Sequence, residues 1–128
     1  MYGDQNGENN GMTPAPVKPT IPLSVMEQID IRVGTIRSVE DVAGSDKLMC
    51  LRVGFGDHER NIVAGIRLER EDPRELEGHQ ALFVINLQPR KMFGVLSQGM
   101  LFDIGFSDGL RPVLAIPETP VPDGCRAS

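Results

Sequence analysis

The feature that most constrains the fold is the distribution of apolar residues, which occur in short runs along the chain. In the clearest run, every second residue from Met49 to Phe55 is a large apolar one, and such alternation is typical of half-buried β-strands. Further short apolar runs lie at residues 29–33, 60–65, 81–87, 99–106 and 113–116. With 14 glycines, 10 prolines and no tryptophan, the chain has the composition of many short strands joined by turns.

Two local signals refine this prediction. The apolar phase changes after Gly34, which indicates a bend or bulge that would let the first strand curl into a barrel. Asp72 and Pro73 have the pattern of a helix N-cap and first turn, with Glu75 at the capping-box position and Gly78 after the end, so we expect a helix of about two turns. The chain is therefore predicted to be all-β, a five-stranded Greek-key OB-fold barrel with one short helix between the third and fourth strands.

The composition divides the chain into two parts. Residues 1–23 are rich in Gly, Asn, Pro and Thr, which predicts a disordered tail or linker because such a segment buries too little apolar surface to offset its conformational entropy. Residues 24–128 are expected to form a single domain. No apolar stretch approaches the roughly 18 residues of a transmembrane helix, and the polar N-terminus is unlike a signal peptide. We expect a cytoplasmic protein with no membrane segment.

The charge and the metal-binding residue types exclude several functions. The formal net charge of −5 argues against a strongly basic nucleic-acid binder, although acidic residues gather between Glu69 and Glu77 and leave room for a locally positive face. The two cysteines and two histidines match no zinc or redox spacing, so we expect unpaired thiols, no metal and no cofactor. No nucleophile and base are paired, and we do not expect an enzyme.

The stretch from Asn86 to Leu101 carries the strongest signal of function. It follows a continuously apolar segment and contains two cations, two glycines and a hydroxyl within about a dozen positions. Loops of this composition can bring the backbone close to a ligand, and functional residues concentrate on loops held by a rigid scaffold. We interpret it as a binding loop that leads into the fifth strand.

Several segments together resemble one family. They are Asp30 to Ile36, Ser45 to Leu48, Ile62 to Ile66, Asn86 to Met92 with Gly94, and Ser97 to Met100. In this order they are similar to the tRNA-binding domain of methionyl-tRNA synthetase C-termini, free-standing tRNA-binding proteins and the cytokine-forming synthetase cofactors. The resemblance covers residues 25–128. It implies an OB-fold that binds the outer corner of tRNA by shape and backbone, and a homodimer in free-standing members.

The resemblance also implies a set of tRNA-binding residues. Arg90 and Lys91 can meet phosphates, and Asn86 and Ser97 can hydrogen-bond sugars or base edges. The expected set is Lys47, Asn86, Arg90, Lys91, Phe93, Gly94, Ser97, Gly99 and Met100. Structural alternatives stay open: the two cations as a solvated turn, Asn86 as a residue that holds the loop through backbone amides, and Met100 as core.

Two departures from the family pattern favour a second hypothesis. Phe93 stands where the family commonly has a further cation, and Asp103 adds a carboxylate where small residues are common, so both lower the positive potential. An exposed Phe93 could instead stack on a base. The leading prediction is a non-catalytic tRNA-binding module that acts in trans or with an aminoacyl-tRNA synthetase. The alternative is a chaperone-like module that binds unfolded peptides through Phe93, Val95 and Leu96.

Overall fold

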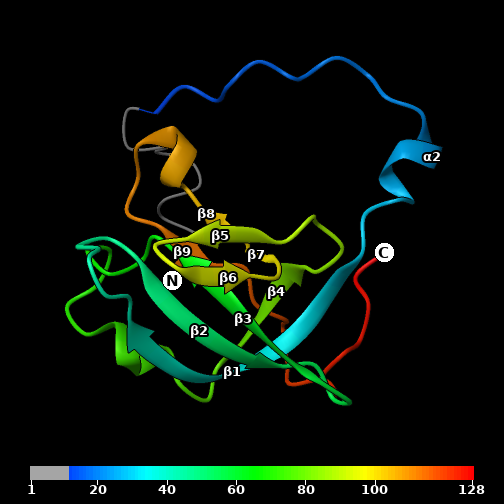
Figure 1. Cartoon of the computed structure of the whole chain (residues 1–128). Coiled ribbons are helices and arrows are strands. Elements are labelled where there is room, and N and C mark those ends of the chain that lie inside the picture. The colour runs from blue at the N-terminus through cyan, green and yellow to red at the C-terminus, as the bar shows by residue number, and fades with distance from the viewer. Residues whose placement is uncertain (1–11) are drawn as a thin grey trace.

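The computed structural model describes residues 12–128 as a curled antiparallel sheet with short accessory elements (Figure 1). The five main strands are β1 (Ile31–Asp41), β2 (Met49–Gly54), β3 (Glu59–Ala64), β4 (Gln80–Val84) and β7 (Met100–Leu101), in the order β3-β2-β1-β4-β7. Two further pairs are β5 (Arg90–Met92) with β6 (Val95–Ser97), and β8 (Asp103–Ile104) with β9 (Val113–Leu114). The helical elements are α2 (Leu23–Met26), η2 (Pro73–Leu76) and η3 (Phe106–Asp108). The predicted OB-like, nearly all-β fold is confirmed.

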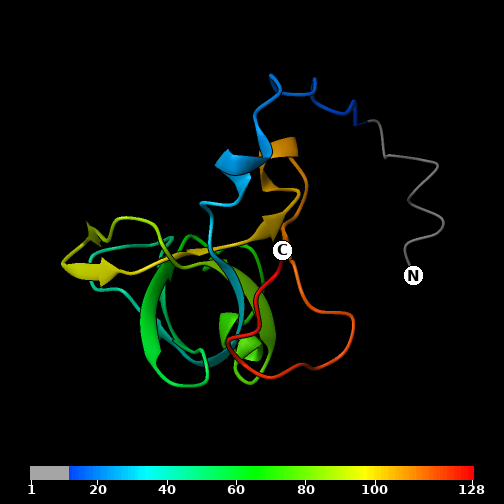
Figure 2. The same ribbon diagram turned by 90° about the vertical axis from the view of Figure 1, so that its right-hand side faces the viewer.

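The sheet closes into a barrel between β3 and the segment that precedes β7, and Figure 2 shows the strands curling around a common centre. Gln98 N donates to Asn61 O at 2.8 Å, and Val63 N donates to Ser97 Oγ at 2.9 Å. Gln98 N belongs to a loop and Ser97 Oγ to a side chain, so the barrel is closed by specific residues as well as by hydrogen bonds between strands.

The core is built from the alternating apolar residues of β1 to β4. Phe83, Ile36, Leu51 and Ile62 are all fully buried. Phe55, which follows β2, packs edge-to-face on Phe83 with ring centroids 5.5 Å apart. The period of two read from the sequence therefore corresponds to the inward face of the barrel.

The irregularity of β1 lies three residues beyond the predicted position. The register with β2 shifts between Ile36 and Ser38, so the bulge is at Arg37 and not at Gly34, while a bend at Gly34 stays a prediction. A Cβ on Gly34 would lie 2.6 Å from Val53 Cγ1 and 2.7 Å from Phe55 Cε1. The glycine is therefore needed because the barrel wall approaches the core side chains closely there.

The predicted helix is present but shorter. Residues 73–76 form one 3-10 turn, capped by Asp72, whose carboxylate accepts from Arg74 N at 3.1 Å. The capping box is not formed, because Glu75 instead pairs with Arg70 at 3.4 Å. The predicted fifth strand is likewise divided into β7 and β8.

The predicted tail covers residues 1–23, of which residues 1–11 lie outside the described residues. Residues 12–22 contain no helix or strand, and α2 begins at Leu23. The disordered tail stays a prediction. At the other end, the extended C-terminal segment lies along β1, where Val33 N donates to Cys125 O and Ala127 N donates to Ile31 O, both at 2.9 Å. No helix of the described part is long and apolar enough to cross a membrane.

Candidate nucleic-acid interface

The stretch predicted to be a binding loop is a β-hairpin formed by β5 and β6, which projects from the side of the barrel (yellow in Figure 2). Its two-residue tip has positive φ at both positions, 49° at Phe93 and 82° at Gly94. Turns of this kind match the twist of the flanking strands, and glycine adopts the second conformation without a Cβ penalty. The sequence concealed this hairpin because each strand has only three residues, too few to show an alternation of apolar and polar side chains.

The two adjacent cations face opposite sides of the hairpin. Arg90 lines a groove together with Met92. Lys91 lies between them in β5, opposite Leu96 of β6, and neither Lys91 nor Leu96 lines the groove. Because successive side chains of a strand alternate between its faces, Lys91 projects from the other face. The Arg-Lys pair therefore presents two separate positive charges and not one cluster.

The groove on the Arg90 side has a volume of about 210 Å³. We call it the hairpin groove, and its lining residues are Val63, Leu87, Gln88, Arg90, Met92, Ser97, Gly99 and Met100. Four of the predicted site residues thus meet in one place. Met100 is exposed at the rim, so the alternative that placed it in the core was wrong.

Ser97 and Gly99 form the base of the hairpin groove and also hold the barrel together. Ser97 is only 5% exposed, accepts from Val63 N and donates to Gly99 O at 3.3 Å. A Cβ on Gly99 would lie 2.8 Å from Val84 O, which is too close for any other residue without a backbone shift. Both residues therefore have a structural role, whether or not they also contact RNA.

Asn86 binds backbone of a different segment. Its Oδ1 accepts from Asp30 N at 2.8 Å, and its Nδ2 donates to Gln28 O at 2.7 Å. The side chain thus connects the end of β4 to the segment between α2 and β1. The hypothesis that Asn86 bonds a backbone amide is confirmed, although the amide belongs to residue 30 and not to the hairpin. Direct contact of Asn86 with RNA stays a prediction.

The turn between β1 and β2 brings Lys47 to the same region. Ser45 Oγ accepts from Lys47 N at 3.3 Å and from Leu48 N at 3.0 Å, which holds the turn. The hairpin tip lies next to this turn, since a Cβ on Gly44 would be 3.5 Å from Phe93 Cδ1. Phe93 is nevertheless 62% exposed. Lys47, Phe93 and the hairpin groove therefore belong to one side of the barrel.

The charges on this side are unneutralised. Within residues 12–128, no carboxylate forms an ion pair with Lys47, Arg90 or Lys91. Elsewhere, ion pairs with carboxylates involve Arg32, Arg37, Arg52, Arg67, Arg70 and Arg74. This side therefore carries three cations that no ion pair with a described carboxylate neutralises.

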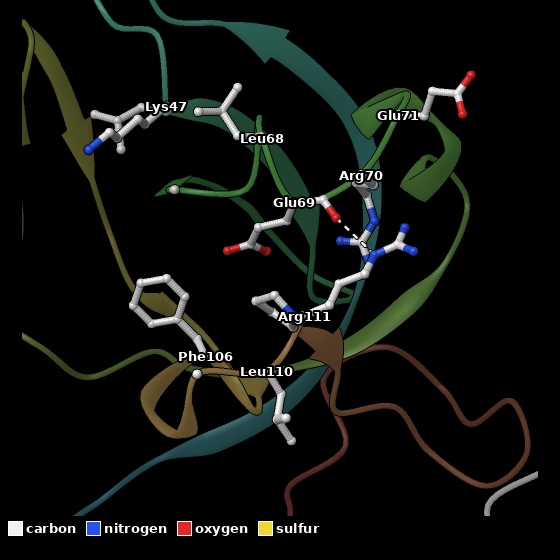
Figure 3. Close-up of a pocket in the computed structure, with 12 residues that line it drawn as sticks. Lys47, Leu68, Glu69, Arg70, Glu71, Phe106, Leu110 and Arg111 are labelled. Atoms are coloured by element: carbon white, nitrogen blue, oxygen red, sulfur yellow. Dashed lines mark hydrogen bonds between the residues drawn. The ribbon is translucent and has the colours of Figure 1, made fainter. Parts of the chain in front are cut away.

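A larger cavity, of about 920 Å³, lies on the other side of Lys47, and sequence reasoning missed it (Figure 3). We call it the Phe106 pocket. Its lining includes Lys47, Leu68, Glu69, Arg70, Phe106 and Arg111. The lining comes from three separate segments, at residues 47–48, 65–71 and 106–112, so no local sequence pattern could have revealed it. The one available signal was Asp103, noted as an unusual carboxylate, which lies behind Glu69.

Two carboxyl groups next to the Phe106 pocket are electrostatically perturbed. Burial, together with the neighbouring charge of Asp103, raises the pKa of Glu69 to about 7. Burial also raises the pKa of Asp103, against the opposing effect of the Arg70 charge. Glu69 Oε1 and Asp103 Oδ1 are buried and have no hydrogen-bond donor among the described residues. A proton on one of the two carboxyls would supply that donor.

Groups able to hold a metal ion are absent from the described part, where no three His, Cys, Asp or Glu side chains cluster. Cys50 and Cys125 are free thiols, as predicted. The arrangement can bind phosphates, sugars and bases through cations, backbone and exposed apolar side chains.

Comparison with known proteins identifies relatives of the whole barrel. The family described as "Putative tRNA binding domain" matches residues 31–126. A methionine–tRNA ligase from Methanothrix thermoacetophila is 44% identical over 108 residues, which are 84% of this chain but 16% of that relative. The chain thus spans about a sixth of the length of that curated relative.

Solved structures agree with this fold. The MetRS-related protein from Pyrococcus horikoshii has a TM-score of 0.80 and 34% identity, and the match covers 87% of this chain and 100% of that one. The chaperone CsaA from Bacillus anthracis has a TM-score of 0.75 and 24% identity, and the match covers 86% of this chain and 100% of that one. The likeness to CsaA is a likeness of fold alone.

Proposed function

This chain belongs to the tRNA-binding domain family, and from that membership we propose that it is a non-catalytic module that binds tRNA by shape and backbone. The proposed contacts are the predicted ones: Lys47, Asn86, Arg90, Lys91, Phe93, Gly94, Ser97, Gly99 and Met100. The observation that carries the proposal is that Lys47, Arg90 and Lys91 lie on one side of the barrel and form no ion pair with a carboxylate of the described residues, whereas six arginines elsewhere do.

The geometry of the hairpin supports contact with RNA on both of its faces. Arg90 faces the hairpin groove and Lys91 faces away from it, so the ribbon can lie between two phosphate-bearing segments of a folded RNA. Phe93 at the tip and Met100 at the rim offer exposed apolar surface to a base or ribose. A tRNA corner presents both kinds of group together, whereas a regular duplex keeps its bases stacked.

Salt dependence of tRNA binding tests this proposal. With three contacting cations, the slope of log affinity against log salt should be roughly −2 to −3, and Arg90→Ala or Lys91→Ala should each make it shallower by about one. Because the two cations face opposite sides, their effects should add. Arg74→Ala is the matched control, since Arg74 is an exposed arginine already engaged by Asp41 at 3.8 Å.

The result against the proposal is equally specific. Equal affinities and salt slopes for the Arg74→Ala and Arg90→Ala variants would place the RNA elsewhere on the barrel. Equal binding of tRNA and of a duplex RNA of the same length would refute recognition by shape.

We also propose a homodimer, supported by the apolar surface next to α2. Leu23, Met26 and Ile29 are exposed and line a cavity of about 540 Å³ together with Ala127 and Ser128 at the C-terminus. A single subunit leaves this surface in water, which is unfavourable for a patch of this kind. Light scattering should give twice the monomer mass, and Met26→Glu should reduce it to the monomer.

The working context is proposed from the same relatives. The 44% identity to a segment of a methionine–tRNA ligase supports action together with a synthetase, or in trans as a separate tRNA-binding factor, in the cytoplasm. Co-purification with the synthetase at native concentration tests the association. A tRNA-bound fraction without synthetase would support action in trans.

A protein-binding function is the second candidate, and the exposed Phe93 and Leu96 of the hairpin favour it. An unfolded peptide would use these apolar side chains more than the cations. Under this alternative, Phe93→Ala should weaken binding of an unfolded client more than Arg90→Ala does. The opposite order, measured with tRNA, supports the RNA-binding function.

A further inference from the structure

The Phe106 pocket has the shape and lining of a small-ligand site. Its volume of about 920 Å³ lies within the range of such sites and exceeds what one nucleotide needs. Phe106 is 67% exposed, although aromatic rings are usually buried. Figure 3 shows Lys47 and Leu68 on one side of the cavity and Phe106 on the other, with the Glu69 carboxylate directed between them.

The polar groups of the lining differ in how they are paired. The side chain of Arg70 is 10% exposed and its Nε pairs with Glu75 Oε1 at 3.4 Å, whereas its Nη1 is buried and makes no hydrogen bond within the described part of the chain. The carboxyl group of Glu69 lies beside that of Asp103, and a proton on one of the two satisfies the buried Oε1. Arg111 Nε, by contrast, donates a hydrogen bond to the backbone oxygen of Glu69 at 3.2 Å (dashed in Figure 3). A buried donor without a partner is costly, so Arg70 Nη1 is an incompletely satisfied group in the wall of the cavity.

Lys47 connects this pocket to the proposed tRNA surface. It lines the Phe106 pocket, and the turn that carries it touches Phe93 at the hairpin tip through Gly44. An RNA segment that runs along the hairpin toward Lys47 therefore reaches the mouth of the pocket. A nucleotide whose phosphate lies on Lys47 could turn its base inward.

We propose that the Phe106 pocket receives one unstacked nucleotide of the bound RNA, a proposal that rests on the tRNA-binding function above. The base stacks on Phe106, its exocyclic amino group faces the Glu69 carboxylate, and its phosphate lies at Lys47. Single-stranded loops of RNA are read in this way, by stacking on aromatic rings and by hydrogen bonds to base edges.

The carboxylate gives the pocket a base preference. Cytosine presents an amino donor where uracil presents a carbonyl, and a carboxylate accepts from the first and repels the second. Above its pKa of about 7, Glu69 is a carboxylate and therefore favours cytosine over uracil. The charges also separate a nucleotide from an apolar peptide side chain, because Lys47 and Arg70 offer donors that only an anionic or polar ligand uses.

The first test is tRNA binding by Phe106 variants. Phe106→Ala should weaken binding of tRNA roughly 5- to 150-fold, the loss expected for one base–aromatic stack, while Phe106→Tyr should retain it. Phe106 lies on η3, which buries no residue, so the barrel should fold normally. Ile116→Ala, which removes an exposed apolar residue outside the pocket, should change nothing. A duplex RNA has no unstacked base and should bind both Phe106 forms equally.

The second test uses single nucleotides and does not depend on tRNA. In an NMR titration, cytidine monophosphate should shift the resonances of Leu68, Phe106 and Leu110, with an affinity roughly 2- to 12-fold above that of uridine monophosphate, as expected for one hydrogen bond. Glu69→Gln should remove the preference, because an amide both donates and accepts.

The outcomes separate this proposal from the proposed function. If tRNA binding depends on Arg90 and is unchanged by Phe106→Ala, and cytidine monophosphate shifts no pocket resonance, the pocket assignment is refuted and the tRNA module stands. If the protein binds no tRNA, the proposed function fails, and the nucleotide titration still decides the pocket. Shifts at Leu68 and Phe106 produced by an apolar peptide and by neither nucleotide would assign the pocket to a protein ligand instead.

Discussion

The buried carboxyl pair predicts a dependence of stability on pH that a single substitution should remove. Glu69 has a pKa of about 7 in the folded protein, against 4.5 for an unperturbed glutamate. Between these values the unfolded chain has released the proton and the folded chain still holds it. The folded state therefore binds more protons than the unfolded state, and the free energy of unfolding falls as pH rises through this interval.

The size of the effect follows from the interval. A difference of about 2.5 pKa units corresponds to at most about 3.4 kcal/mol, and partial exposure of Glu69 and its coupling to Asp103 reduce this to about 1–2 kcal/mol. The penalty is absent below the unfolded pKa and complete above about pH 7. The raised pKa of Asp103 likewise makes the free energy of unfolding fall as pH rises. Asp30 and Asp57, whose pKa values are lowered, change the free energy of unfolding only at lower pH.

Urea unfolding at about pH 5 and about pH 8 measures this difference. From the lower to the higher pH, the free energy of unfolding of the wild type should fall by about 1–2 kcal/mol more than that of Glu69→Gln, because glutamine fills the same volume and does not ionise. Glu71→Gln is the matched control, since Glu71 is an exposed glutamate two residues along the same segment. Parallel stability curves for wild type and Glu69→Gln would refute the reasoning and would mean that Glu69 is as well solvated when folded as when unfolded.

Three further substitutions test the structural roles of site residues by urea unfolding. Ser97→Ala leaves Val63 N without its acceptor in a buried position, and it should destabilise the barrel by about 1–3 kcal/mol; no loss would mean that water replaces the hydroxyl. Gly99→Ala places a methyl group 2.8 Å from Val84 O and should cost about 1–3 kcal/mol, whereas a neutral result would show that the strand shifts freely. Asn86→Ala removes two hydrogen bonds to exposed backbone and should cost about 1 kcal/mol; a large loss of tRNA affinity beyond this would reveal direct RNA contact.

The sequence was a good guide wherever a residue's environment follows from its neighbours along the chain. The alternation from Met49 to Phe55 predicted β2 and its inward face, because the pleat of a strand alternates side chains whatever lies around it. Asp72 and Pro73 likewise predicted the position of η2. The predicted length of that helix was wrong because the backbone is already extended at Glu77, whose carboxylate accepts from Val39 N at 2.9 Å, a contact that only the tertiary structure provides.

The stretch predicted to be a binding loop is a hairpin, so its predicted form was wrong, and its role in binding stays a prediction. Its two strands have only three residues each, too few for a clear alternation, and the tip uses Phe93 at a φ of 49°, where glycine or asparagine is the usual signal. Once the segment is a hairpin, the alternation of side chains separates Arg90 from Lys91.

By itself, the sequence determined the fold class, the family and the segment that carries the proposed site, because these depend on short-range patterns and on motifs in a fixed order. Only the tertiary structure decided that Ser97 and Gly99 close the barrel and that Asn86 ties β4 to residue 30. It alone assembled the Phe106 pocket from separate segments and left Glu69 facing Asp103. The physical reason is that burial, hydrogen-bond partners and pKa shifts are set by groups that meet across the barrel, at distances along the chain that no local pattern spans.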